Sequence, residues 1–149
     1  MTSKILGWFG AGDFSHVDIV LDSGFLLGAR SDSIGGRPPG VQIRPPGYDP
    51  KWQKQVIIRV PCDPLQKVAA DAFAYAQVGK AYDKLAIIGF AVGRDWRDPS
   101  DWFCSELGAR YGEVGGVWSG LLTPENKIEP SPLAMMASGM PGRTIQVIK

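Results

Sequence analysis

The pattern of apolar and polar residues predicts a group of short strands early in the chain. Residues 15–21 (SHVDIVL) alternate with the period of a half-buried strand, and the Asp-Ser-Gly at 22–24 is a turn signal. Residues 25–30 are expected to return as the hairpin partner of that strand. A short strand follows at 41–44, and the β-branched run at 54–60 (KQVIIRV) predicts the most clearly buried strand.

Helical spacing dominates the rest of the chain. Apolar residues recur at helical intervals over 63–78, where Asp63 can cap the N-terminus, Pro64 suits the first turn and Gly79 ends the helix. Strands grouped early and surrounded by helices predict an α+β fold with an antiparallel sheet packed against helices. The remaining expected elements are helices at 83–92, 102–111 and 131–138, and a closing strand at 144–148.

The composition fits one compact domain. The chain has 149 residues, of which 44% are hydrophobic, and this is enough to form a core. We expect a single domain over 1–149, with an N-terminal segment at 1–11 and the closing strand within 139–149.

Charge and hydropathy argue against two classes of partner. Sixteen Lys and Arg against fifteen Asp and Glu leave a net charge of +1, so no basic surplus favours nucleic acid. No stretch approaches the ~20 apolar residues that a membrane span needs, and the apolar part of residues 1–9 is too short for a signal peptide. We therefore expect no nucleic-acid partner, no stable membrane insertion and a chain that is cytoplasmic when it is synthesised.

The cysteines and the single histidine do not form a metal-binding pattern. Cys62, Cys104 and His16 lack the close CxxC or HxxxH spacing that brings ligands together. Two thiols in a chain without an export signal are expected to stay reduced. We expect no metal and no cofactor.

Cys104 and His16 are candidates for nucleophilic chemistry. Cys104 stands where the predicted helix at 102–111 begins, and unpaired N–H groups at a helix start favour a thiolate. An imidazole beside it can take the thiol proton and later protonate a leaving group. The alternative is a small buried residue at Cys104 and a polar-face histidine at His16.

Five short motifs carry a resemblance to a known superfamily. Residues 12–21 (GDFSHVDIVL) resemble the GD…HVGIYLG strand of the NlpC-type papain-like superfamily, and 26–29 (LLGA) fall where its next strand lies. Residues 79–83 (GKAYD) resemble its G-x-P-Y motif, and 103–107 (FCSEL) its helix-start C-S-[GE]-L motif. Residues 131–133 (SPL) are similar to a late S-P-x-x-L segment of one branch.

The order of the motifs resembles the circularly permuted branch of that superfamily. In the usual cell-wall peptidases the cysteine helix precedes the histidine strand, whereas here His16 comes first, as in the YiiX-like proteins and lecithin:retinol acyltransferase. The GKAYD and FCSEL motifs favour the YiiX-like group. The resemblance implies a permuted papain-like fold with Cys104 as nucleophile, His16 as base and Tyr82 near the nucleophile as an oxyanion-stabilising or substrate-binding residue.

The chain departs from the family at the residue that orients the imidazole. This polar residue would fall at Gly28, which has no side chain to do so. Asp18, Asp32, Gln42 or a backbone carbonyl could accept the hydrogen bond instead, and Asp18 lies two residues from His16 on the same strand face. The site would otherwise be a dyad or a degenerate relic.

The resemblance implies a cysteine hydrolase of the amidase or peptidase type. It would cleave a peptide-like amide, such as a peptidoglycan stem peptide, through an acyl-enzyme on Cys104. The alternative from another class is a structural or binding component of a phage or prophage tail tip, virion-associated and contacting other tail proteins. A further alternative is a lipid acyl hydrolase or acyltransferase.

Overall fold

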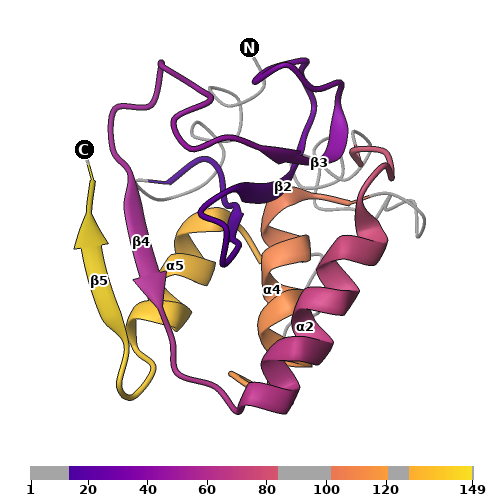
Figure 1. The fold of residues 1–149 in the computed structure, drawn as a ribbon. Coiled ribbons are helices and arrows are strands. Elements are labelled where there is room, and N and C mark those ends of the chain that lie inside the picture. Colours follow the sequence, from indigo (N-terminus) through magenta and orange to yellow (C-terminus); the bar gives the residue numbers. More distant parts are fainter. Residues whose placement is uncertain (1–13, 84–101, 121–127, 149) are drawn as a thin grey trace.

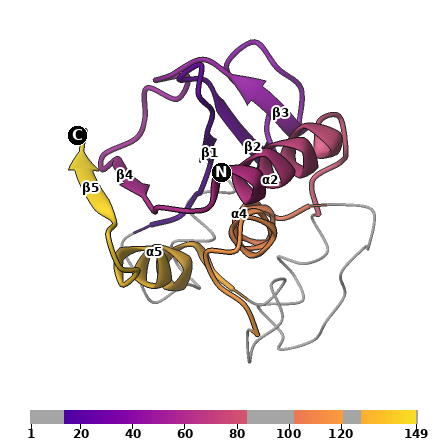
Figure 2. The same ribbon diagram turned by 60° about the horizontal axis from the view of Figure 1, so that its bottom comes forward.

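The computed structural model describes residues 14–83, 102–120 and 128–148. In these residues the fold is α+β, as expected, with three helices and two antiparallel sheets. Figures 1 and 2 show one sheet lying over the N-terminal end of helix α4, with α2 beside α4, and the second sheet standing next to α5. The expected helix at 83–92 falls almost wholly outside the described residues.

The first sheet has the order β1-β2-β3. Its strands are β1 (Ile19–Val20), β2 (Leu26–Arg30) and β3 (Gly40–Arg44), and both pairings are antiparallel. All five residues of β2 are buried, because β2 is flanked by a strand on each side and contacts α4. The predicted hairpin and the strand at 41–44 are therefore confirmed.

The strand expected at 15–21 is much shorter than predicted. Only Ile19–Val20 is paired, so His16 lies on an extended segment before β1 and not within a strand. This segment also contacts α5. The backbone N–H of Phe14 donates to Ser131 Oγ (3.0 Å) at the start of α5, and Val17 packs against the cluster around Leu133.

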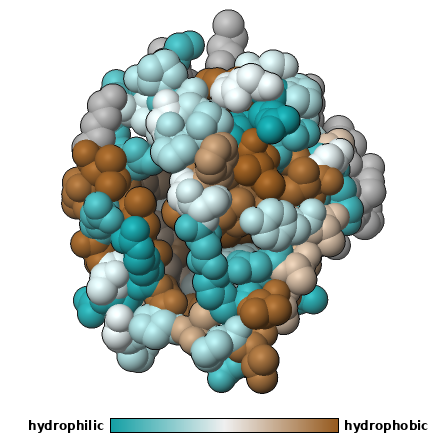
Figure 3. Space-filling view, viewed as in Figure 1, coloured by the Kyte–Doolittle hydropathy of each residue, from teal (hydrophilic) through white to brown (hydrophobic). Residues whose placement is uncertain are grey.

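The strand predicted to be the most buried is not buried. β4 (Val56–Arg59) pairs only with β5 (Thr144–Val147), so this two-stranded sheet leaves β4 half-buried and β5 exposed. Figure 3 shows hydrophobic surface along β5, where Ile145 and Val147 are exposed. The β-branched run predicted a strand correctly, but burial depends on neighbours that the local sequence does not specify.

Helix α2 (Pro64–Gln77) begins and ends where the sequence predicts. Asp63 accepts hydrogen bonds from Leu65 N (2.9 Å) and Gln66 N (3.3 Å), and Gly79 follows the helix at φ +91°. Several large apolar residues of α2 face outward, since Leu65, Val68 and Tyr75 are exposed. The buried residues of the helix are Ala70, Ala74 and Gln77.

The core lies between the first sheet, α2 and α4 (Cys104–Val114). Its fully buried members include Leu27, Val41, Phe103 and Leu107, which join β2, β3 and α4. Helix α5 (Pro130–Ser138) packs against α4 through Leu133. The helices expected at 102–111 and 131–138 and the strand at 144–148 are confirmed, with ends shifted by a few residues.

Within the part of the chain that the structure describes, no helix has the length and apolar character that crossing a bilayer requires. The longest of these helices, α2, has 14 residues.

Candidate active site

Cys104 is the first residue of α4 and is buried. The preceding residue, Phe103, is the N-cap in an extended conformation, and Cys104 is 1% exposed. The N–H groups of a first helical turn have no acceptor within the helix and carry partial positive charge. Cys104 therefore has the helix-start position that the sequence predicted, a position that favours negative charge on sulfur.

Tyr82 lies next to this cysteine through a short backbone pairing. Asp83 N donates to Trp102 O (3.1 Å) and Trp102 N donates to Ala81 O (3.0 Å), so residues 81–83 run beside the start of α4. The Tyr82 ring packs on Phe103 with centroids 5.9 Å apart. Burial, and then the charge of Cys104, raises the pKa of the Tyr82 hydroxyl, which stays protonated and able to donate.

The GKAYD segment is also fixed to the sheet. Val41 N donates to Lys80 O and Gly79 N donates to Val41 O, each at 2.8 Å. Gly40 has φ +105°, and a Cβ there would stand 2.4 Å from Lys80 O. The close approach of β3 and residue 80 therefore requires glycine at position 40.

His16 lies between Cys104 and Asp18. Its Nε2 lies 2.9 Å from Asp18 Oδ1, and the Cys104 side chain is close enough to help raise the pKa of the imidazole. The structure thus brings together the histidine and the cysteine that the sequence placed 88 positions apart (104 − 16).

Asp18 occupies the space beside Gly28, the position at which the family resemblance led us to expect a polar residue. A Cβ on Gly28 would stand 1.7 Å from Asp18 Oδ1 and 2.9 Å from its Cγ. Any side chain at position 28 would therefore displace the carboxylate that holds His16. Glycine leaves the space, and an aspartate two residues after the histidine fills it.

The other two candidates for orienting His16 lie elsewhere. Both carboxylate oxygens of Asp32 accept hydrogen bonds from Arg30, at 2.7 and 2.9 Å. The hydrogen bond and charge of Arg30 lower the pKa of the Asp32 carboxyl most, and the charge of His16 lowers it least. Gln42 stands opposite Gly28 in the register of β2 and β3. Of the three predicted residues, Asp18 is the one hydrogen-bonded to the imidazole.

The charges of this cluster stabilise an imidazolium. Burial alone would lower the pKa of His16, but the charge and hydrogen bond of Asp18, followed by those of Cys104, outweigh it and raise the pKa to about 10. Burial likewise opposes ionisation of Asp18, yet His16 and then Tyr48 keep the pKa of this carboxyl below its ordinary value. At neutral pH the site therefore holds an imidazolium beside a carboxylate.

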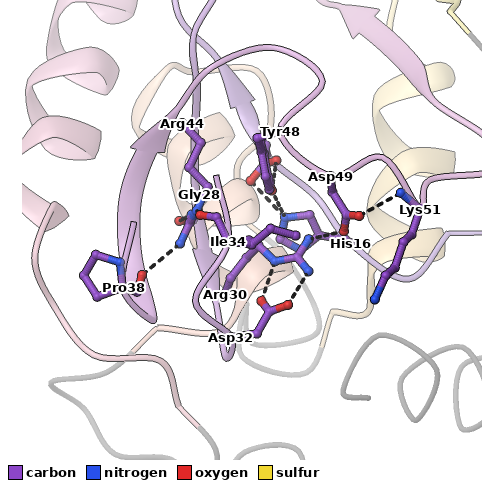
Figure 4. A network of polar contacts seen from close by, with 11 residues as sticks. His16, Gly28, Arg30, Asp32, Ile34, Pro38, Arg44, Tyr48, Asp49 and Lys51 are labelled. Atoms are coloured by element: carbon purple, nitrogen blue, oxygen red, sulfur yellow. Dashed lines mark hydrogen bonds and ion pairs between the residues drawn. The ribbon is translucent and has the colours of Figure 1, made fainter. Parts of the chain in front are cut away.

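Tyr48 also belongs to this cluster, although the sequence analysis did not predict it. Its hydroxyl donates to Asp18 Oδ2 (2.7 Å) and lies 3.2 Å from His16 Nε2. Figure 4 shows Tyr48, His16 and the Arg30 side chain converging. Tyr48 follows Pro-Pro-Gly in a loop, where neither strand nor helix periodicity marks a residue as buried, and so the sequence carried no signal for it.

Ser105, next to the cysteine, has a structural role in this geometry. Its hydroxyl donates to Ile128 O at 2.5 Å and is fully buried. Cys62, in contrast with Cys104, is an exposed free thiol. Among the described residues, no group of three or more His, Cys, Asp and Glu side chains could hold a metal ion.

Comparison of the chain with protein-family models, with curated proteins and with solved structures finds no match.

Proposed function

We propose that this protein is a cysteine hydrolase with a circularly permuted papain-like fold of the YiiX-like type. The observation that carries the proposal is the position of the His16 imidazole, which is bonded through Nε2 to Asp18 and is close enough to the helix-start Cys104 for that side chain to raise its pKa. A helix-start cysteine, an imidazole and a carboxylate in this order form the minimal device for acyl transfer. The order of His16 before Cys104 and the contact of Tyr82 with the start of α4 support the family resemblance.

The proposed reaction begins from a thiolate–imidazolium pair. The Cys104 sulfur attacks the carbonyl carbon of an amide, and the resulting oxyanion accepts hydrogen bonds from the Cys104 backbone N–H and the Tyr82 hydroxyl. His16 then protonates the departing nitrogen as the C–N bond breaks, which leaves a thioester on Cys104. Water attacks the thioester while His16 takes its proton, and the carboxylic acid product leaves as the thiolate re-forms.

A peptide-like amide is the proposed substrate class, with a peptidoglycan stem peptide as the first candidate. The imidazolium favours this choice because a poor leaving group such as an amine needs a proton at the moment the bond breaks. A lipid ester has a better leaving group and depends less on that proton. A lipid acyl hydrolase or acyltransferase is therefore the second choice.

The test is hydrolysis of soluble muropeptides, followed by mass spectrometry, with a long-chain p-nitrophenyl ester as the probe for lipid ester chemistry. We expect cleavage of an amide bond in the muropeptides and its loss in Cys104→Ala. Cys62→Ser is the matched control, since it removes the exposed thiol and should cleave normally. Cleavage that persists in Cys104→Ala, or no cleavage of any probe, would overturn the proposal.

The burial of Cys104 supports a second candidate function. With 1% of Cys104 exposed, a substrate reaches the sulfur only after the covering side chains move. A closed site is also what a tail-tip structural or binding protein with a relic of the hydrolase site would show. In that case Cys104→Ala would assemble and bind like the wild type while neither form cleaved any probe.

A further inference from the structure

We propose that Tyr48 is a positioning residue of the active site, which acts through Asp18 to hold the His16 imidazole toward Cys104. This inference rests on the proposed function for its catalytic meaning. The arrangement itself rests on the contacts of described residues, and can be tested without a substrate.

The first argument is the division of the Asp18 carboxylate between two partners. Oδ1 lies 2.9 Å from His16 Nε2, and Oδ2 accepts the Tyr48 hydroxyl at 2.7 Å. A carboxylate bonded through one oxygen only could rotate and carry the imidazole with it. The second bond fixes the carboxylate plane, and through it the direction of the ring. The Tyr48 oxygen, 3.2 Å from Nε2, is a second acceptor for the same ring proton.

The second argument is that Tyr48 is itself held by its surroundings. The guanidinium groups of Arg30 and Arg44 stand 5.6 and 5.5 Å from its ring centroid, and the Trp52 ring meets it edge-on at 4.8 Å. A Cβ on Gly35 would stand 2.8 Å from Tyr48 Cβ, so the loop also packs closely against it. The hydroxyl is therefore placed before any substrate binds.

The two arginines are fixed in turn by separate anchors. Arg30 is bound by Asp32 and, through Nη1, by Asp49 Oδ2 at 3.0 Å. Arg44 is fully buried and donates to the backbone oxygens of Gly28, Ile34 and Pro38 at 3.1 to 3.3 Å. Both side chains are thus held in place where they pack against the Tyr48 ring (Figure 4).

If Tyr48 only filled space beside the buried carboxylate, removing its hydroxyl would have a different effect on the Asp18 titration. The groups facing Asp18 and His16 are Tyr48 from the loop, Arg44 from β3, Cys104 from α4 and, through charge, Asp32. Tyr48 donates to the ionised form of Asp18 and so favours it. Removing the hydroxyl should move the protonation of Asp18 to higher pH, whereas a lost packing contact would change stability without moving that titration.

The experiment compares Tyr48→Phe with Tyr111→Phe. Tyr111 donates to Asp71 Oδ1 at the same 2.7 Å, between α2 and α4, so its variant loses an equivalent bond away from the site. The readout is the NMR titration of the His16 ring, which is unambiguous because the chain has one histidine. The chemical shift of the Nε2–H signal changes at acid pH when its partner Asp18 is protonated. In Tyr48→Phe we expect the midpoint of this change to move up by about one pH unit, because the ionised Asp18 loses a hydrogen-bond donor.

Cys104 alkylation by iodoacetamide provides the kinetic readout, and we expect it to slow about tenfold in Tyr48→Phe, a typical loss for an outer hydrogen-bond partner. If Tyr48→Phe shifts the His16 titration no more than Tyr111→Phe does, the inference is wrong. Should Tyr48→Phe not fold, 3,5-difluorotyrosine at position 48 keeps the ring and strengthens the donor, and the transition should then move to lower pH. Absence of muropeptide cleavage in the wild type would overturn the proposed function but would leave these NMR outcomes unchanged.

Discussion

At the scale of single residues, the site depends on one glycine and one carboxylate. Gly28 has no side chain, and Asp18 occupies the space that a side chain at 28 would need. The carboxylate reaches the imidazole from the histidine's own segment of chain.

Gly28→Ala should therefore damage the site more than an ordinary methyl group would. Its Cβ would overlap Asp18 Oδ1 at 1.7 Å. We expect unfolding to become easier by about 1–3 kcal/mol, as for overpacked sites, and Cys104 alkylation to slow. Urea titration and mass spectrometry measure the two effects. Gly139→Ala is the control, since a Cβ there makes only ordinary contacts at 3.5 Å; equal effects in the two variants would refute this explanation of Gly28.

Asp18→Asn should make His16 neutral at neutral pH. Burial lowers the pKa of the ring, and the Asp18 carboxylate is the main group that outweighs it. We expect the pKa of His16 to fall from about 10 to near or below its ordinary value of 6.5. The NMR titration of the single histidine measures this directly. Asp32→Asn, which removes a carboxylate bound to Arg30, should leave the pKa of His16 above its ordinary value.

Which site residues could be predicted depended on how local their signals are. His16 and Cys104 were found because a lone histidine and a helix-start cysteine are visible in sequence. Asp18 was one of three candidates, since spacing alone cannot show which carboxylate an arginine has already bound. Tyr48 was not found, because its burial comes from Arg30 and Arg44 on separate strands.

At the scale of elements, two segments distant in sequence are brought to the start of α4. The backbone bonds of residues 81–83 with Trp102 place Tyr82, and the segment before β1 places His16. The ends of α2 and α5 were predictable because caps and prolines act locally. The burial of β4 and the length of β1 were not, since both depend on partners elsewhere in the chain.

Asp63→Ala should weaken the fold without changing the chemistry. It removes the two N-cap hydrogen bonds of α2, at 2.9 and 3.3 Å, and should destabilise the protein by about 1 kcal/mol. Urea unfolding measures the loss, and Asp63→Asn, which keeps an acceptor, should restore most of it. A changed pH profile of Cys104 alkylation in Asp63→Ala would show that α2 influences the site more directly than its contacts indicate.

At the scale of the whole molecule, the charged cluster links stability to pH. The pKa of His16 is raised when the protein folds, so its stabilising contribution is complete below the unfolded value of 6.5 and is lost as the pH rises toward about 10. We expect the free energy of unfolding to fall across that range, measured by urea titration at several pH values. His16→Gln should flatten this part of the curve; an equal slope in the variant would show that other groups cause it.

The central claim is that Cys104 and His16 form a thiolate–imidazolium pair. The most direct test is iodoacetamide labelling of the native wild type and of His16→Gln at pH 7, with Cys104 and the exposed Cys62 quantified in the same sample. Burial slows the labelling of Cys104 in both proteins, so the ratio of the two rates reports what His16 contributes. Cys104 should label at least about tenfold faster in the wild type than in His16→Gln, whereas Cys62 should label at the same rate in both. Equal Cys104 rates in the two proteins would contradict the account.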